Sequence, residues 1–392
     1  MKALRNQIDK IKPSFEKGGK FEKWMPVFES FETFLFVPTH TAPSKGAHVR
    51  DYNDLKRTMI IVVMALIPAL LFGMFNVGYQ HFLAVGDSAT FFETFIYGFL
   101  RVLPLIIVSY AVGLGTEFVF GMKRGHSLHE GFLVTGMLIP LIVPIDVPLW
   151  QVAVATVFSV VFAKEVFGGT GMNIFNVALV TRAFLFFAYP SKMSGDSIWV
   201  RAAEKGAPFT DGFSGATPLA QAAASEGTVK IVDGVGDPVS AWDMFLGLIP
   251  GSIGETSTLA ILIGAVILLV TGIASWKIIL SVFGGGLAMG LLLNVFGVNA
   301  FMDMPAYYHL ILGGFALGAV FMATDPVTAS RTEKGKWIYG SLIGILAVLI
   351  RVVNPAYPEG MMLAILIMNM FAPLVDYMVV QGNIKRRLKR AA

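Results

Sequence analysis

The sequence predicts an all-α polytopic membrane protein with about ten transmembrane helices. Of its 392 residues, 55% are hydrophobic and only 14% are charged, whereas a soluble domain carries about a quarter charged residues. The apolar residues form long uninterrupted runs, and the basic residues gather at both ends of the chain. A porin-type barrel would instead alternate apolar and polar residues. We therefore expect helices whose outer surface faces lipid.

Two residue types exclude whole classes of electron carrier. The chain has no cysteine, which rules out iron–sulfur ligation, thiolate chemistry and disulfides. A membrane cytochrome of the b type needs pairs of histidines inside facing helices, and nearly all of the six histidines lie in loops or at the edges of spans. They are His40, His48, His81, His126, His129 and His309.

The apolar runs locate the expected spans. Residues 58–79 carry no charge and are long enough to cross the hydrocarbon core of a bilayer. The third span is short and contains Pro140 and Pro144, so we expect a half-helix or a re-entrant segment there. The ten spans are expected to begin near Thr58, Phe95, Gly131, Pro148, Asn173, Thr258, Ile278, Tyr307, Trp337 and Gly360.

Basic residues predict the orientation. Residues 1–57 hold 11 Lys and Arg, and residues 381–392 hold five, so both termini are expected in the cytoplasm. The loop 191–257 then falls on the outer side. The predicted organisation is a basic arm (1–57), a first five-helix unit (58–190), an outer loop (191–257), a second five-helix unit (258–380) and a basic tail (381–392).

The two five-helix units show a weak internal similarity. Trp150 precedes Lys164 by 14 positions, and Trp337 precedes Arg351 by the same interval. Because five is odd, repeats of five helices would lie in opposite senses in the bilayer. Inverted repeats with broken helices place binding sites near the midplane. A chance similarity is the alternative.

One segment of the outer loop has the pattern of a helix start. Thr217 is a good N-cap, and Pro218 suits the first helical position. The exposed N–H groups of such a start attract anions, and the small residues Ser214, Gly215 and Ala216 would let a bulky group approach Thr217. An ordinary capped surface helix has the same pattern.

The segment SGATPL (214–219) resembles a flavinylation motif. The resemblance is to a family that contains the B-type membrane subunit of the Na⁺-translocating NADH:quinone reductase (NQR) and the D-type membrane subunit of the Rnf complex. It implies that Thr217 carries FMN through a phosphoester made by a separate flavin transferase, within a motif that includes Asp211, Ser214, Gly215 and Ala216. Further stretches resemble the B-type NQR member: HVRDYNDLKR (48–57), AKEVFGGTGMNIFN (163–176), RAFLFFAYP (182–190), IPGSIGETSTLA (249–260), FMATDPV (321–327) and RVVNPAYPEGMMLAIL (351–366).

The resemblance implies a redox role in a bacterial inner membrane. The chain would pass electrons through covalent FMN, and through a non-covalent riboflavin, to ubiquinone, coupled to Na⁺ export. It contains no Walker A or dinucleotide-binding pattern, so NADH oxidation would belong to a different polypeptide, a flavoprotein. We expect a hetero-oligomer in the lipid bilayer and no nucleic-acid partner.

Polar residues inside the expected spans are the other candidates for function. The family segment that resembles the surroundings of Gly113 and Glu117 implies a quinone site; a carboxylate that snorkels to water is the alternative. Asn173 and Asn176 are expected on one helix face, where they could bond the edge of a riboflavin ring or, instead, a neighbouring helix. Arg182, in the middle of a span, must have a partner.

Acidic residues are candidates for a cation path, since Na⁺ prefers oxygen ligands. Asp325 and Asp376 are the main candidates, with Glu255 and Glu359 beside expected helix starts. Acids at helix ends are also ordinary partners of the helix dipole, so no complete Na⁺ site is predicted.

Two other functions remain open. The D-type member of an Rnf complex shares the SGAT motif but resembles the basic N-terminal arm less. A urea-type channel or transporter would also suit an inverted repeat with broken helices. Bound flavin distinguishes the channel from the redox protein.

Overall fold

The computed structural model confirms an all-helical chain. It describes residues 2–36, 46, 55–124, 131–195, 198–201, 212–225, 227, 229–354 and 359–391. Within these ranges no strand forms, and the only sheet-like contact is an isolated antiparallel bridge between Val232 and Pro238.

Six helical stretches are long and apolar enough to cross a membrane. Three shorter apolar helices pack among them. The six are α3 (Leu55–Val85), α4 (Phe91–Arg124), the continuous stretch Leu149–Phe167, α11 (Trp276–Phe296), α14 (Glu333–Val353) and α15 (Met361–Ala391). The stretch Leu149–Phe167 comprises α6 (Leu149–Ser159), a π-helical turn (Val160–Lys164) and a 3₁₀ turn (Glu165–Phe167). The shorter ones are α5 (Phe132–Leu141), α7 (Val177–Ala188) and α10 (Thr258–Val270).

The eighth expected span, near Tyr307, is not a continuous helix. It is divided into short pieces, because Gly313 and Gly314 adopt φ values of 61° and 67° that a right-handed helix cannot contain. The pieces are α12 (Tyr308–Ile311), α13 (Phe315–Leu317) and a π-helical turn (Gly318–Met322). The third expected span is short, as predicted, since α5 ends one residue after Pro140.

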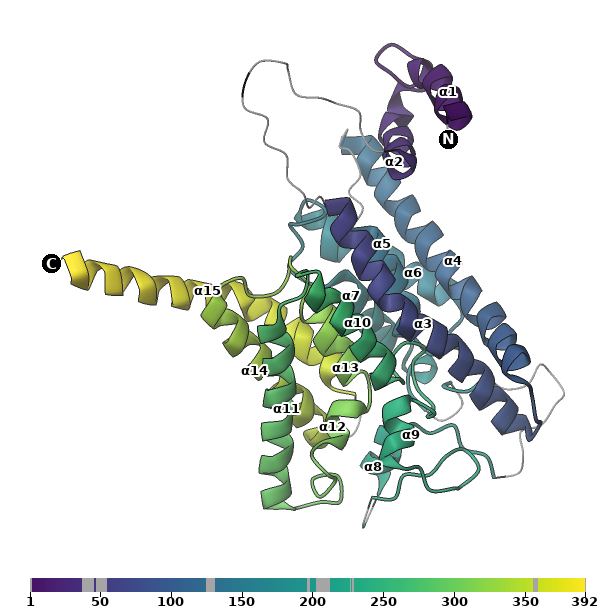
Figure 1. The fold of residues 1–392 in the computed structure, drawn as a ribbon, viewed down its shortest axis with the longest axis vertical. Helices are drawn as coiled ribbons and strands as arrows, with labels where there is room; N and C mark the ends of the chain where they lie inside the picture. The colour runs from purple at the N-terminus through teal and green to yellow at the C-terminus, as the bar shows by residue number, and fades with distance from the viewer. Residues whose placement is uncertain are drawn as a thin grey trace.

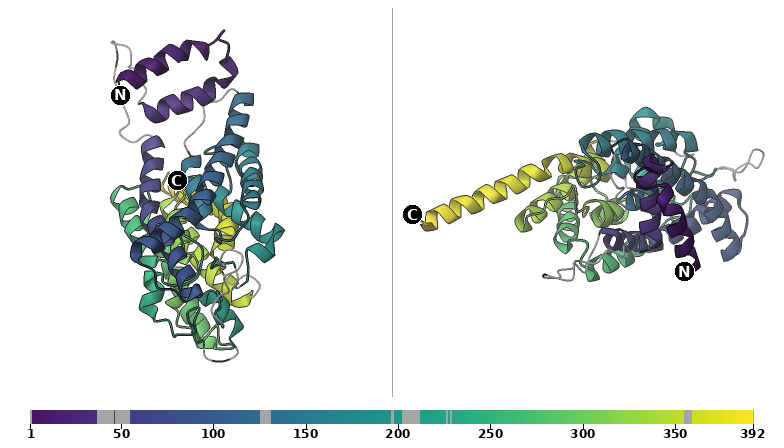
Figure 2. Two further views of the ribbon diagram at one scale, coloured as in Figure 1. Left: turned by 90° about the vertical axis from the view of Figure 1, so that its right-hand side faces the viewer. Right: turned by 90° about the horizontal axis from the view of Figure 1, so that it is seen from above.

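The remaining helices lie at the two ends of the molecule (Figure 1). The N-terminal pair α1 and α2 lies at one end, and α8 and α9 lie at the opposite end. The C-terminal part of α15 projects away from the bundle (Figure 2). The pieces are α1 (Lys2–Ile11), α2 (Met25–Leu35), α8 (Pro218–Ala224), α9 (Ala241–Leu246) and 3₁₀ turns at Lys12–Ser14, Glu22–Trp24 and Pro190–Lys192.

Small residues allow α3 and α4 to approach closely. A Cβ atom added at Gly98 would lie 1.7 Å from the backbone oxygen of Met74, and one added at Gly78 would lie 1.9 Å from that of Thr94. Lipid chains are as apolar as leucine, so helices in a membrane associate mainly through such close packing. Glycine at these positions therefore holds the first two long helices together.

We expect Gly98→Val to destabilise the protein by about 3 kcal/mol, because overpacking against rigid backbone costs that much. Gly115→Val in the same helix is the matched control, since, apart from the adjoining turns of its own helix, no atom of the described residues lies within 4 Å of the added Cβ. Thermal unfolding of the two purified variants in detergent measures the difference. Equal unfolding temperatures would show that the α3–α4 contact is not tight.

Candidate functional site

Thr217 begins α8, as the sequence predicts. Its backbone is extended, and its Oγ1 accepts a hydrogen bond from the N–H of Ala220 at 3.2 Å. The helix has only seven residues, so its dipole is small. The N–H of Ala216 donates to Ser214 Oγ at 3.3 Å, and Gly215 is buried. Asp211 lies outside the described residues.

Gln221 holds the loop that presents Thr217. Its side-chain amide nitrogen donates to the carbonyl oxygens of Ala216 at 3.1 Å and Val232 at 2.9 Å. Its amide oxygen accepts the N–H of Val232 at 2.9 Å. These bonds tie the residues before α8 to the segment after it, so the position of Thr217 is determined by contacts on both sides.

Thr217 borders a small cavity of about 30 Å³ at the α8–α9 end. The cavity reaches from Thr217 to buried acidic and hydroxyl groups of other elements. Two buried oxygens beside it, Glu255 Oε1 and Thr256 Oγ1, have no hydrogen-bond partner among the described residues. Its lining is Trp199, Thr217, Pro218, Leu219, Ile249, Pro250, Gly251, Ser252, Glu255, Thr256, Leu312, Gly313 and Glu359.

Arg182 has the partners that its burial demands. Its side chain is 2% exposed and forms an ion pair with Glu359. It also donates to Ser252 Oγ at 3.1 Å and lies 3.7 Å from a carboxylate oxygen of Glu255. A lone buried charge would cost several kcal/mol, so these acids compensate Arg182. They are thereby less suited to bind a cation on their own.

Arg351 is a second buried arginine, and its importance was missed by sequence reasoning. Its guanidinium donates to four carbonyl oxygens, of His309 (2.5 Å), Leu312 (2.8 Å), Gly313 (2.9 Å) and Glu359 (2.7 Å). The first three belong to the broken stretch from α12 to α13, where carbonyls lose their helical partners. The one available signal was the equivalence of Arg351 and Lys164 in the internal repeat.

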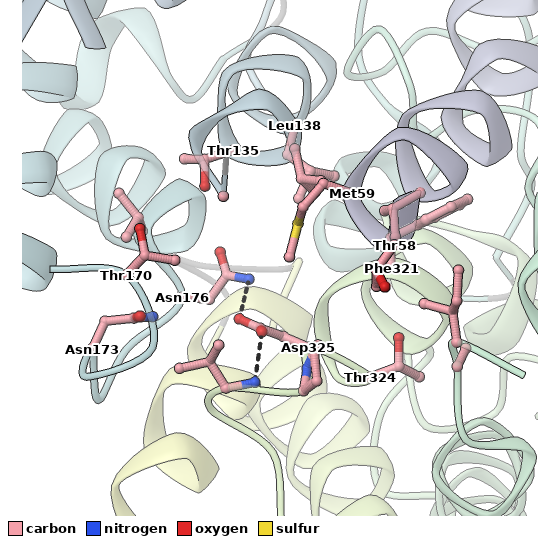
Figure 3. Close-up of a pocket in the computed structure, with 18 of the residues that line it drawn as sticks. Thr58, Met59, Thr135, Leu138, Thr170, Asn173, Asn176, Phe321, Thr324 and Asp325 are labelled. Atoms are coloured by element: carbon pink, nitrogen blue, oxygen red, sulfur yellow. Dashed lines mark hydrogen bonds between the residues drawn. The ribbon is translucent and has the colours of Figure 1, made fainter. Parts of the chain in front are cut away.

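A larger cavity, of about 90 Å³, contains three of the predicted site residues (Figure 3). Asn176 Nδ2 donates to Asp325 Oδ2 at 3.4 Å, and Asn173 lies on the loop beside them. Asp325 also accepts the N–H of Val327 at 3.0 Å and the hydroxyl of Thr328 at 3.2 Å. The structure thus brings together two riboflavin candidates and one Na⁺ candidate. The cavity is lined by Thr58, Met59, Val62, Gly131, Val134, Thr135, Leu138, Lys164, Thr170, Asn173, Asn176, Val177, Leu268, Ile273, Ala274, Phe321, Thr324, Asp325, Pro326 and Val327.

The expected shared helix face of Asn173 and Asn176 is wrong. Helix α7 begins only at Val177, and Asn176 is its N-cap, accepting the N–H groups of Ala178 (3.1 Å) and Leu179 (3.3 Å). Asparagine competes with the helical backbone for hydrogen bonds and so favours the cap over the helix interior. Asn173 bonds within its own loop, to the carbonyl of Phe175 and the N–H of Gly171.

Glu117 and Lys164 form a buried ion pair. The exposed fractions of Glu117 and Lys164 are 4% and 5%, so Glu117 does not snorkel to water. Gly113, one turn earlier on α4, lies against the ring of Phe132, where an added Cβ would come within 1.8 Å of a ring carbon. The space directly beside Gly113, where the resemblance implies a quinone site, is therefore occupied by Phe132.

Asp376 is fully engaged by the start of α14. It accepts the hydroxyls of Ser330 and Thr332, both at 2.6 Å, and the N–H groups of Arg331 (2.8 Å) and Thr332 (3.0 Å). These bonds anchor α15 to the residues before α14. In the part of the chain that the structure describes, no three or more His, Cys, Asp or Glu side chains cluster as metal ligands would.

Known proteins resemble this chain in sequence along almost its whole length. Residues 42–385 match the model of the NQR2, RnfD, RnfE family. Among the similar proteins are three that are named as the B-type subunit of Na⁺-translocating NADH-quinone reductase. That of Pseudomonas paraeruginosa is 50% identical over 99% of both chains, and that of Klebsiella pneumoniae is 49% identical over 99% of both. That of Chromohalobacter salexigens is 49% identical over 99% of this chain and 97% of its own. The chain belongs to the NQR2, RnfD, RnfE family.

Proposed function

We propose that the chain is the membrane subunit of a Na⁺-pumping NADH:ubiquinone oxidoreductase in a bacterial inner membrane. The observation that carries the proposal is the identity of about 50%, along the full length, to proteins named as the B-type member of that enzyme. Those names favour this function over that of the D-type Rnf protein. NADH oxidation is assigned to a partner flavoprotein, and a separate transferase attaches the flavin.

Thr217 is the proposed attachment point of covalent FMN. Its Oγ1 accepts one hydrogen bond, from Ala220, which an esterified oxygen can still do. Ser214, Gly215 and Ala216 precede it as a run of small residues, which add little bulk next to its hydroxyl. Because α8 has only seven residues, its dipole contributes little, and the tether itself would hold the group. When bound, the FMN supplies the capacity to carry electrons.

The cavity of Asn176 and Asp325 is the proposed place of riboflavin. Its lining is mostly apolar, which suits the face of a flavin ring, and Asn173 and Thr170 add amide and hydroxyl groups that suit the edge of the ring. The side-chain amide of Asn176 donates a long, weak hydrogen bond of 3.4 Å to Asp325, so it could exchange that bond for one to a ligand. Asp325 is also the better Na⁺ candidate, since Asp376 already accepts four hydrogen bonds.

Helix α7 joins the two regions. Asn176 caps its start beside the larger cavity, and Arg182 reaches the acids beside the Thr217 cavity. Six residues of helix span about 9 Å. A change of charge at one region is therefore close enough to be felt at the other, as coupling of electron transfer to ion movement requires.

The orientation that we propose places both termini in the cytoplasm and loop 191–257 in the periplasm. The positions of α1 and α2 at one end of the molecule, and of α8 and α9 at the other, support it (Figure 1). The proposed inverted repeat is supported by its paired basic residues, Lys164 and Arg351, which are both buried and both bound.

Na⁺-dependent respiration tests the function. Inverted membrane vesicles from the host should oxidise NADH with ubiquinone and take up Na⁺, and both activities should disappear when this chain is deleted. Restoring the full chain should restore both. If the deletion leaves Na⁺ uptake and quinone reduction unchanged, the proposed function is wrong; solute flux without any bound flavin would indicate a channel.

The quinone role of Glu117 predicts a selective loss. In Glu117→Gln, quinone reduction should fall at least tenfold, while the NADH-oxidising partner still reduces an artificial acceptor. The reason is that the neutral amide lacks the carboxylate that the proposed role requires. Steady-state rates with the two acceptors give the comparison. Equal losses in both assays would indicate an assembly defect, and unchanged rates would exclude the role.

A further inference from the structure

Lys164 lies between two candidate sites that the sequence assigns separately. Its ammonium group pairs with Glu117 of α4, the quinone candidate. Its side chain also lines the cavity that contains Asn176 and Asp325, the proposed riboflavin site. Of the basic side chains in the described part of the chain, Lys164 alone lines this cavity.

The backbone presents Lys164 in an unusual way. It is the last residue of the π-helical turn Val160–Lys164, which interrupts the otherwise helical stretch Leu149–Phe167. π-turns of this kind occur frequently at functional sites, because the extra residue redirects a side chain. A plain continuation of α6 would rotate Lys164 away from its present direction.

The surroundings of Lys164 leave its charge unscreened by water. It is 5% exposed, and its ammonium nitrogen lies 6.0 Å from the centre of the Phe132 ring. Phe132 in turn fills the space beside Gly113. Charges act more strongly in such a setting than at a surface. The acids that oppose Lys164 here are Glu117, in direct contact, and Asp325, across the cavity.

We propose that Lys164 is a positioning residue that raises the reduction potential of the flavin in the Asn176–Asp325 cavity. It also links the charge of that flavin to Glu117. Reduction adds negative charge to a flavin, so a nearby ammonium favours the reduced form. The same attraction weakens the hold of Lys164 on Glu117, which makes that carboxylate more available beside the quinone. This inference rests on the proposed function, because it requires a flavin in this cavity.

The test measures the reduction potential of the non-covalent flavin in the purified full-length chain. Thr217→Ala provides the background, so that no covalent flavin contributes to the absorbance. Lys164→Met should disfavour the reduced form, and Glu117→Gln should favour it. A unit charge acting over about 10 Å at an effective dielectric constant of about 20 changes the equilibrium constant for reduction of the flavin about tenfold. For a one-electron step, tenfold corresponds to about 59 mV.

Two further variants sharpen the result. Lys164→Arg keeps the charge and should restore the potential of the parent. Arg124→Met is the matched control: Arg124 pairs with Glu165, next to Lys164, but its side chain is 37% exposed and does not line the cavity. Arg124→Met should shift the reduction potential by less than a third of the shift that Lys164→Met causes.

The outcomes separate the two proposals. If the parent chain holds no non-covalent flavin, the proposed riboflavin site fails. If flavin is bound and Lys164→Met leaves its potential unchanged, the role of Lys164 is excluded while the flavin site stands. Loss of flavin in Lys164→Met with retention in Lys164→Arg supports the role, and equal loss in both overturns it.

Discussion

Chain isolated from its own host should carry a covalent flavin that Thr217→Ala removes completely. The ester needs the hydroxyl oxygen, and alanine has none. The denatured wild-type chain should fluoresce as a flavin band on a gel, and the variant should be dark. Mass spectrometry of the peptide containing Thr217 should show the added mass of FMN without one water.

Two control variants distinguish loss of the ester from loss of folding. Thr217→Ala also removes the N-cap of α8, which costs about 1 kcal/mol. Thr217→Asn keeps a capping side chain but no hydroxyl, so it should be dark as well. Thr256→Ala removes a second threonine hydroxyl beside the same cavity and should remain fluorescent. A fluorescent Thr217→Ala chain would place the flavin elsewhere.

Arg351→Met should destabilise the protein by about 4 kcal/mol or more. The guanidinium satisfies four carbonyl oxygens, three of them in the broken stretch from α12 to α13. Hydrogen bonds to a charged donor contribute about 1.5–3 kcal/mol each. A buried carbonyl oxygen that loses its donor also loses the compensation for its removal from water. The unfolding temperature of the purified chain in detergent measures the loss.

Lysine should not rescue this position, because an ammonium group cannot reproduce the planar fork of donors. Arg351→Lys is therefore expected to be nearly as unstable as Arg351→Met. Arg331→Met is the matched control, since Arg331 is an exposed arginine just before α14. If Arg351→Met unfolds at the wild-type temperature, the broken stretch does not depend on this side chain.

Whether the sequence predicts the roles of Thr217 and Arg351 depends on how far apart in the chain the interacting residues lie. The N-cap role of Thr217 was predictable because it involves Thr217, Pro218 and Ala220 alone. The role of Arg351 was not, because its acceptors lie 38 to 42 residues earlier, apart from the carbonyl of Glu359. Sequence periodicity carries no information about which distant carbonyls lose their helical partners.

The asparagine pair shows how a local signal can mislead. The spacing of Asn173 and Asn176 fits a helix face, yet both lie before α7. The preceding glycines Gly168, Gly169 and Gly171 adopt positive φ values and keep the segment non-helical. The sequence contained this warning, since three glycines in four residues oppose a helix.

The sequence by itself determined that this is a helical membrane protein, because the preference of each apolar segment for lipid depends only on the residues of that segment. It also determined that Arg182 must have a partner, because an isolated buried charge is too costly. Only the tertiary structure decided that the partners are Glu255 and Glu359, and that Asn176, Asp325 and Lys164 border one cavity. Glu255 and Glu359 lie 73 and 177 positions from Arg182, and Lys164 and Asp325 lie 161 positions apart. Their meeting depends on which helices pack together, and packing between helices is set by close contacts such as that of Gly98 with Met74, which no single segment encodes.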